Sequence, residues 1–152
     1  MKVLLINGSP HKNGCTYTAL AEVARELEKN GVETEIFYIG SKPVGGCVGC
    51  WACGKLGKCV HDDVVNEALP KVAEADGIVF GSPVYYAGVN GSMLGFMQRL
   101  AVSGGKYLNF KPAAIVASAR RAGTTATLDA LAKVPAYFNM PLVSGCYWPM
   151  VH

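Results

Sequence analysis

Several motifs that commonly reveal a protein's chemistry are absent from this chain of 152 residues. There is no Gly-x-Gly-x-x-Gly, the fingerprint of dinucleotide-binding folds, and no Gly-Lys-Ser or Gly-Lys-Thr to close a Walker phosphate loop. No Ser-His-Asp set, carboxylate pair or metal-hydrolase motif is present either, which argues against a hydrolase.

The chain also lacks the marks of export and of membrane insertion. No apolar run reaches the roughly 18 residues of a membrane helix, and Met1-Lys2 leads directly into an apolar strand without the pattern of a signal peptide. The net charge of +3 is scattered along the chain, which disfavours a nucleic-acid surface. We therefore expect a cytoplasmic protein with neither a membrane nor a nucleic acid as its partner.

What the chain does contain is a high share of hydrophobic residues, 51%, which is typical of a parallel sheet buried on both faces. Apolar runs predict strands at 2–7, 32–38, 77–80, 113–117 and 142–143. Helical periodicity predicts helices at 16–30, at 62–75, around 93–100 and from 124 onward. We expect Pro70 to kink or split the second helix and Thr124 to cap the last one.

This alternation of strands and helices predicts a single α/β domain over residues 1–152. Five strands suit a flavodoxin-like, doubly wound parallel sheet in the order 2-1-3-4-5, whose ligand crevice opens at the carboxyl ends of strands one and three. A cysteine-rich insert at 40–60 follows strand two. The pattern reaches His152 before the helix that would cover strand five, so we expect this C-terminal helix to be missing from the sequence.

The segment from Asn7 to Thr16 joins the first predicted strand to the first predicted helix. It reads Asn-Gly-Ser-Pro-His-Lys-Asn-Gly-Cys-Thr. A loop of this kind presents backbone N–H groups and the positive end of a helix to an anion. Because neither the dinucleotide nor the Walker pattern is present, we predict a mononucleotide such as FMN. The alternative is an ordinary strand-to-helix turn.

A second loop, predicted at 82–91, leaves the same crevice after the third strand. Pro83 stiffens this loop, and Gly88 allows the backbone to approach a planar ligand closely. Tyr85 and Tyr86 offer flat apolar surfaces with polar tips. The combination suits the isoalloxazine ring of a flavin; the alternative is that both tyrosines only pack within the protein.

Six cysteines are present. The compact pattern Cys-x2-Cys-x2-Cys-x5-Cys is formed by Cys47, Cys50, Cys53 and Cys59. Its spacing favours a [4Fe-4S] cluster over zinc, because zinc ribbons usually separate two Cys-x2-Cys pairs by a longer spacer. Zinc and metal-free thiols are the alternatives. We expect the two other cysteines, Cys15 and Cys146, to be buried as small apolar residues.

Two motifs, Gly-Ser-Pro-x-x-x-Gly-x-Thr near the start and Gly-Ser-Pro-Val-Tyr-Tyr after the third strand, resemble those of the NADPH-dependent FMN reductase superfamily of flavodoxin-like proteins. Within that superfamily, the cysteine pattern followed by Asp62-Asp63 is most similar to that of the iron–sulfur flavoproteins. The resemblance covers the whole chain. It implies a bound FMN, reduction by a nicotinamide or a small electron carrier, and a homo-oligomer.

The resemblance also implies which residues bind the cofactor. The FMN phosphate would be held by Ser9, His11, Asn13, Gly14, Cys15 and Thr16. The flavin ring would be bordered by Pro83, Val84, Tyr85, Tyr86, Ala87 and Gly88, with Ser118 and Arg120 near its far edge. The chain departs from the family at four positions. It has His11 where family members often have Arg, and Cys15 where they often have Asn. It has Gly95 and Gln98 where they usually have Lys and Asp.

We therefore predict an FMN-dependent oxidoreductase that passes electrons from NAD(P)H or a reduced carrier to a small acceptor such as a quinone or a flavin. A [4Fe-4S] cluster is the expected second carrier. Because the flavin does the chemistry, no side chain is assigned a catalytic role. The alternatives are a non-enzymatic, flavodoxin-like electron carrier that serves a redox protein partner, and a cysteine-based metal- or redox-sensing protein. The net charge of +3 argues against the first, since flavodoxins are usually strongly acidic.

Overall fold

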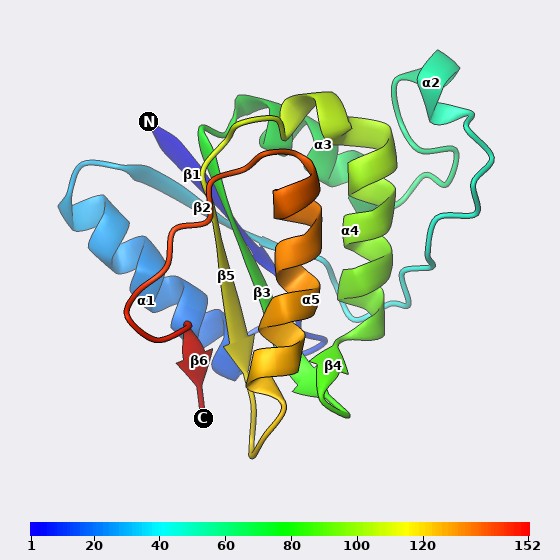
Figure 1. The fold of residues 1–152 in the computed structure, drawn as a ribbon. Helices are drawn as coiled ribbons and strands as arrows, with labels where there is room; N and C mark the ends of the chain where they lie inside the picture. The colour runs from blue at the N-terminus through cyan, green and yellow to red at the C-terminus, as the bar shows by residue number, and fades with distance from the viewer.

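The computed structural model describes residues 1–152 and consists of one twisted sheet with helices on both faces (Figure 1). Its strands are β1 (Lys2–Asn7), β2 (Glu33–Tyr38), β3 (Gly77–Tyr85), β4 (Gly88–Val89), β5 (Ala113–Ser118) and β6 (Met150–Val151). Its helices are α1 (Cys15–Lys29), α2 (Cys53–Leu56), α3 (Val64–Glu74), α4 (Gly91–Gly104) and α5 (Thr124–Tyr137), with a 3-10 turn η1 (Gly105–Tyr107) after α4. No helix has both the length and the apolar character needed to cross a membrane.

The strands run in the order β2-β1-β3-β5-β6, and every neighbouring pair in this series is parallel. Strand β4 pairs antiparallel with the end of β3. Among the parallel strands alone, this is the order 2-1-3-4-5, so the predicted flavodoxin-like fold class is confirmed. The cysteine-rich insert lies between β2 and α3, as predicted.

Alternate side chains along each strand pack on opposite faces of the sheet. Leu4, Ile6 and Phe80 belong to the larger core, together with residues of α3, α4 and α5. Leu5 packs instead with Leu20 of α1 on the opposite face. Figure 1 shows α1 on one side of the sheet and the three longer helices that follow on the other. Both faces are therefore apolar, which explains the near-continuous hydrophobic runs of the central strands.

Two predictions about strands are wrong. The predicted loop at 82–91 begins as a continuation of β3 and turns back as β4, because Val84 and Tyr85 pair with Val89 and Gly88. The predicted strand at 142–143 is reduced to a single bridge between Leu142 and Ala113. The fifth parallel position beside β5 is instead filled by β6, eight residues further along the chain than Leu142.

The predicted split of the second helix at Pro70 and the predicted cap at Thr124 are also wrong. Helix α3 continues through Pro70 as one element, and Pro70 lies on its exposed side, where the ring meets solvent and not the sheet. Helix α5 has Gly123 as its N-cap without a side-chain hydrogen bond, so Thr124 is the first helical residue and not the cap. At the start of α3 the Asp63 side chain caps the helix and accepts a hydrogen bond from the Val65 amide at 3.0 Å.

Candidate functional site

The segment between β1 and the first turn of α1, residues 7–17, is here called the amide loop. Its path is fixed by its own polar groups. Asn7 is fully buried; its Oδ1 accepts from the Ser9 amide at 3.1 Å, and its Nδ2 donates to the Lys12 carbonyl at 3.1 Å. The Ser9 hydroxyl accepts from the His11 amide at 3.1 Å, and the Gly14 amide donates to the His11 carbonyl at 3.3 Å. A short loop is thus held in one conformation.

A set of backbone N–H groups in the amide loop donates no hydrogen bond within the chain. They belong to Lys12, Asn13, Cys15, Thr16 and Tyr17. The N-cap is Gly14, which has no side chain to satisfy them, and the first turn of α1 contains no acidic residue. Unpaired N–H groups at a helix N-terminus carry partial positive charge and bind anions. The amide loop therefore has the chemistry of a phosphate site.

Close packing ties the amide loop to the rest of the sheet. The Gly8 amide donates to the Gly81 carbonyl at 2.9 Å, and a Cβ on Gly8 would lie only 2.8 Å from that oxygen and 2.6 Å from Met93. The Tyr38 hydroxyl donates to the Pro10 carbonyl at 2.7 Å. Asn7 and Tyr38 were not among the predicted site residues. The spacing of Asn7 two positions before Ser9 was the available signal, because an Asn side chain commonly accepts from the amide two residues on.

The predicted ring-binding loop is a tight β-hairpin at the carboxyl end of β3. Its two turn residues, Tyr86 and Ala87, both have positive φ angles, of 49° and 57°. This is the backbone sign that a two-residue hairpin turn of type I′ requires, and Asn or Gly normally supplies it. The Tyr86 side chain is fully exposed, and Tyr85 is half-exposed. The turn therefore presents two aromatic rings outward and does not pack them into the core.

Strand β5 ends beside both of these segments. Thr16 Oγ1 and Ser118 Oγ lie 2.7 Å apart and share a buried hydrogen bond, so two predicted site residues 102 positions apart in the sequence are in contact. Pro83 pairs in register with Ser118. One open hollow at this edge is lined by Val84, Tyr86, Ala87, Ala119, Arg120, Arg121 and Ala122. The fold thus brings the ends of β1, β3 and β5 to one site.

The remaining predicted residues of the amide loop, His11, Asn13 and Cys15, are exposed. The burial predicted for Cys15 and Cys146 is wrong, because both thiols are exposed. Cys15 is the first residue of α1, where its side chain points away from the sheet-facing stripe of Thr16, Leu20 and Ala24. Cys146 lies in the irregular stretch that precedes β6.

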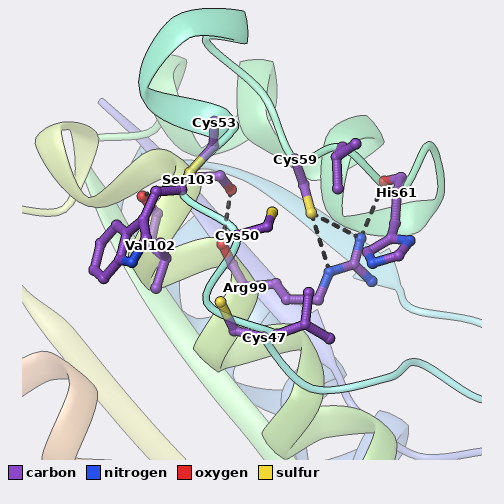
Figure 2. A pocket seen from close by; sticks show the side chains of 11 residues that line it. Cys47, Cys50, Cys53, Cys59, His61, Arg99, Val102 and Ser103 are labelled. Atoms are coloured by element: carbon purple, nitrogen blue, oxygen red, sulfur yellow. Dashed lines mark hydrogen bonds between the residues drawn. The ribbon is translucent and has the colours of Figure 1, made fainter.

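The segment from Val44 to Val60, here called the cysteine segment, brings its four cysteines around one pocket (Figure 2). The pocket is lined by Cys47, Val48, Cys50, Trp51, Cys53, Cys59, Val60, His61, Arg99, Val102 and Ser103. Cys47 and Cys50 are exposed, and Cys53 and Cys59 are half-buried. No three His, Cys, Asp or Glu side chains lie close enough together to hold a metal ion. The predicted ligands are therefore gathered but not yet arranged as a coordination shell.

Helix α4 is the platform for the cysteine segment. Ser92 Oγ accepts from the Val44 amide at 3.3 Å. Gly95 makes room for the chain, since a Cβ there would lie 2.5 Å from the Val44 carbonyl oxygen. At the far end, the Cys53 thiol donates to the Val102 carbonyl at 3.7 Å. These anchors recur at helical spacing, so one face of α4 supports the whole segment.

Arg99 is the charged member of that face and is only 3% exposed. Its Nη1 and Nη2 donate to the two carboxylate oxygens of Asp63 at 2.6 and 2.9 Å, a bidentate pair. Its Nε and Nη2 both donate to Cys59 Sγ at 3.2 Å, and Nη2 also donates to the His61 carbonyl at 3.0 Å. Figure 2 shows the guanidinium reaching from α4 to the cysteine and to His61.

The Arg99–Asp63 pair is held in its charged form. The hydrogen bonds that Arg99 donates to the Asp63 carboxylate raise the pKa of Arg99 above its ordinary value, although burial opposes the shift. Burial tends to raise the pKa of Asp63, but hydrogen bonds from Arg99 and from the Val65 amide outweigh it, and the net pKa is lowered. A permanent positive charge therefore lies against the Cys59 sulfur. Arg99 was not predicted, because nothing in its local sequence signals a contact 40 positions away.

Comparison with known proteins identifies the family. A profile of the family described as NADPH-dependent FMN reductase matches residues 1–152. The chain belongs to this family. The predicted resemblance to this family is confirmed. The predicted similarity to the iron–sulfur flavoproteins is confirmed as well, because a curated relative, an iron–sulfur flavoprotein of Methanocaldococcus jannaschii, is 41% identical over 99 residues. That match covers 65% of this chain and 51% of the relative. The chain thus spans about half the length of the curated relatives it matches.

Solved structures with the same fold are more distant in sequence. The flavoenzyme NAD(P)H:(acceptor) oxidoreductase FerB of Paracoccus denitrificans superposes with a TM-score of 0.72 at 17% identity, over 97% of this chain and 77% of FerB. A flavodoxin from the domain Archaea superposes with a TM-score of 0.68 at 16% identity, over 99% of this chain and 83% of that one. At this level of identity, the likeness establishes the fold.

Proposed function

We propose that this member of the NADPH-dependent FMN reductase family binds FMN and acts as an oxidoreductase, taking electrons from NAD(P)H or a reduced carrier and passing them to a small-molecule acceptor. The observation that carries the proposal is the row of unpaired N–H groups in the amide loop, next to the ends of β3 and β5. When bound, FMN supplies a centre that accepts two electrons together and releases them singly or in pairs. The chain's own residues bind and orient it.

In this proposal, the amide loop holds the FMN phosphate. The N–H groups of Asn13, Cys15 and Thr16 donate to the phosphate oxygens, and the hydroxyls of Ser9 and Thr16 add further donors. Gly14 leaves the approach open because it has no side chain. His11 is exposed at the rim of the loop, where its ring can meet a phosphate oxygen.

The hairpin would border the flavin ring. The proposed border consists of Pro83, Val84, Tyr85, Tyr86, Ala87 and Gly88, with Ser118 and Arg120 at the far edge. The two outward-facing tyrosine rings offer stacking surface, and Arg120 lines the same hollow as Tyr86 and Ala87. An open hollow of this kind leaves a nicotinamide or another flat substrate access to the ring.

The cysteine pocket fits a [4Fe-4S] cluster in its donor set, and we propose Cys47, Cys50, Cys53 and Cys59 as the ligands. Four thiols line one pocket beside a buried cation, and soft thiolate donors at this density are those that iron–sulfur clusters use. The name of the Methanocaldococcus relative, an iron–sulfur flavoprotein, supports the same assignment. Cys47 and Cys50 are exposed and their sulfur atoms make no hydrogen bond, so binding of the cluster would itself set the final positions of these two side chains.

The proposal is tested with protein prepared without oxygen and loaded with FMN. We expect it to oxidise NADH or NADPH when a quinone, an azo dye or free flavin is supplied, and to lose this activity when FMN is removed and regain it on reloading. A protein that carries FMN but does not oxidise either nicotinamide would be an electron carrier of the flavodoxin type. A protein that does not take up FMN would contradict both. A cytoplasmic location and a homo-oligomeric assembly remain predictions.

A further inference from the structure

Arg99 uses more of its hydrogen-bonding capacity on the cysteine segment than a structural ion pair requires. A bidentate pair with Asp63 occupies one side of the guanidinium. The other side donates twice to Cys59 Sγ and once to the His61 carbonyl. Burying an arginine is costly unless all its donors are paired. Two of these five hydrogen bonds are accepted by a sulfur atom.

Cys59 is also the cysteine whose backbone is held most firmly. Its amide donates to Asn66 Oδ1 at 2.9 Å, and its carbonyl accepts from Asn66 Nδ2 at 3.0 Å. The thiol is thus oriented from two helices, by Asn66 on α3 and by Arg99 on α4. Cys47 and Cys50 are exposed and make no comparable hydrogen bonds through their thiols. Cys59 is therefore the ligand position held by the most contacts; Cys53 has one hydrogen bond through sulfur, to the Val102 carbonyl.

We propose that Arg99 is the positioning residue of the cysteine site: it fixes the Cys59 sulfur as the first ligand and places a positive charge beside the negative charge that accumulates on metal-bound thiolates. This inference rests on the proposed metal-binding role of the four cysteines. Residues that hydrogen-bond a metal-ligating side chain commonly contribute about 10- to 100-fold to metal affinity. Hydrogen bonds and positive charge at cluster sulfurs also raise the reduction potential, because they stabilise the more negative, reduced form.

The test begins with the metal-free full chain and Co²⁺ as the probe, titrated without oxygen and followed by thiolate-to-cobalt absorption. Arg99→Met keeps most of the side-chain length and removes the charge and all the donors. We expect it to weaken Co²⁺ binding by about 10- to 100-fold. Arg99→Lys keeps the charge but loses the planar guanidinium that donates to Asp63 and Cys59 at the same time. We expect it to bind Co²⁺ more tightly than Arg99→Met and more weakly than the unaltered chain. Arg25→Met, which removes an exposed arginine paired with Glu22 on α1, is the matched control and should bind like the unaltered chain.

The second readout is the reduction potential of the cluster after reconstitution with iron and sulfide. It should shift to more negative values in Arg99→Met and less so in Arg99→Lys, whereas a residue with only a structural role would leave it unchanged. Urea unfolding of the metal-free variants reports whether each one folds. If neither Arg99 variant unfolds cooperatively while Arg25→Met does, Arg99 is a structural residue and the inference fails.

The remaining outcomes separate this inference from the proposed function. Equal Co²⁺ affinity in the unaltered chain and in a folded Arg99→Met would overturn the role of Arg99 and leave the metal site standing. Absence of thiolate-to-cobalt absorption in the unaltered chain would overturn both. An FMN titration on the same samples shows whether the flavin half of the proposed function survives in that case.

Discussion

The amide loop and the cysteine segment differ in how much of each site is finished by folding alone. In the amide loop the donors are backbone N–H groups, and a buried Asn7 and short local bonds fix their directions. In the cysteine segment the proposed metal-binding atoms are side-chain sulfurs. Of the four, only those of Cys53 and Cys59 make hydrogen bonds. Backbone donors are positioned whenever a strand and a helix form, whereas thiol ligands need tertiary contacts and then the metal itself.

The two sites are also supported by largely different elements of the fold. The amide loop depends on β1, α1 and the ends of β2, β3 and β5, with Met93 of α4 packed against Gly8. The cysteine segment depends on another part of α4 and on the start of α3. If this division holds, each site can be damaged without the other. The following predictions test that independence, beginning with the largest effect.

Replacing Gly95 by alanine should cause the largest change, and only at the cysteine segment. The new Cβ would lie 2.5 Å from the Val44 oxygen and 2.9 Å from the carbonyl carbon of Gly45, and backbone cannot yield as a flexible side chain can. We expect the iron content after reconstitution to fall by more than half and the free energy of unfolding to drop by about 1–3 kcal/mol. Gly54→Ala is the control, because a Cβ at Gly54 meets nothing within 4 Å. Unchanged iron content in Gly95→Ala would show that α4 does not position the segment.

Replacing Thr16 by valine should damage only the amide loop. Valine keeps the shape but removes the hydroxyl that pairs with Ser118 and that we assign to the phosphate. Hydrogen bonds to a charged group contribute about 1.5–3 kcal/mol, so FMN should bind about 10- to 100-fold more weakly. The measurement is quenching of FMN fluorescence, with the exposed Thr125→Val on α5 as control. Loss of iron together with FMN in Thr16→Val would break the proposed independence.

A change to the scaffold at residues that line neither site should affect neither of them. Glu35 on β2 pairs with Lys71 on α3 and with Lys2 on β1. Its pKa is lowered, first by the hydrogen bond with Lys71 and then by Lys2, with burial opposing. A lowered carboxyl pKa adds stability that is complete above the ordinary value of 4.5 and is lost as pH falls through the lower, folded value.

Glu35→Gln should therefore reduce the free energy of unfolding by about 0.5–1 kcal/mol near neutral pH, and the gap to the unaltered chain should close below pH 4.5. Urea unfolding at several pH values measures the gap. A double-mutant cycle with Lys71→Met assigns it to the pair. A gap that stays constant from neutral to acidic pH would show that the pair does not contribute. At neutral pH, the FMN and iron content of Glu35→Gln should equal those of the unaltered chain.

The smallest effect is expected at the hairpin. Ala87 has a φ of 57°, which costs a residue with a Cβ about 1 kcal/mol and costs glycine little. Because glycine also loses more chain entropy on folding, Ala87→Gly should be neutral or stabilising by a few tenths of a kcal/mol. Ala119→Gly, at a position without positive φ, should destabilise instead. Thermal unfolding compares the two variants. Equal destabilisation of both would show that the positive φ at Ala87 does not strain the hairpin.

Much of the fold follows from local patterns in the sequence. Alternating apolar runs and helical periodicity predicted the parallel sheet and its order, because each strand carries its own buried faces. The fifth strand was misplaced because Leu142 and Met150 are both short apolar candidates, and only pairing with β5 chooses between them. The hairpin was missed because Tyr86 and Ala87 are not the residues that normally signal such a turn.

The candidate sites divide in the same way. The amide loop and the four cysteines were predicted because each lies within one short stretch of chain. Arg99 and the fit of Gly95 against Val44 were not, because both arise from contacts between segments that are distant in the sequence. A single sequence carries no sign of which buried arginine will meet which cysteine.

The claim that the amide loop grips a phosphate is tested most directly by comparing FMN with riboflavin, which carries the same ring without the phosphate. Fluorescence titration of the flavin-free chain gives both dissociation constants. Several hydrogen bonds to a charged group, each contributing about 1.5–3 kcal/mol, predict that FMN binds at least ~100-fold more tightly than riboflavin. Equal affinities for the two flavins would contradict the account.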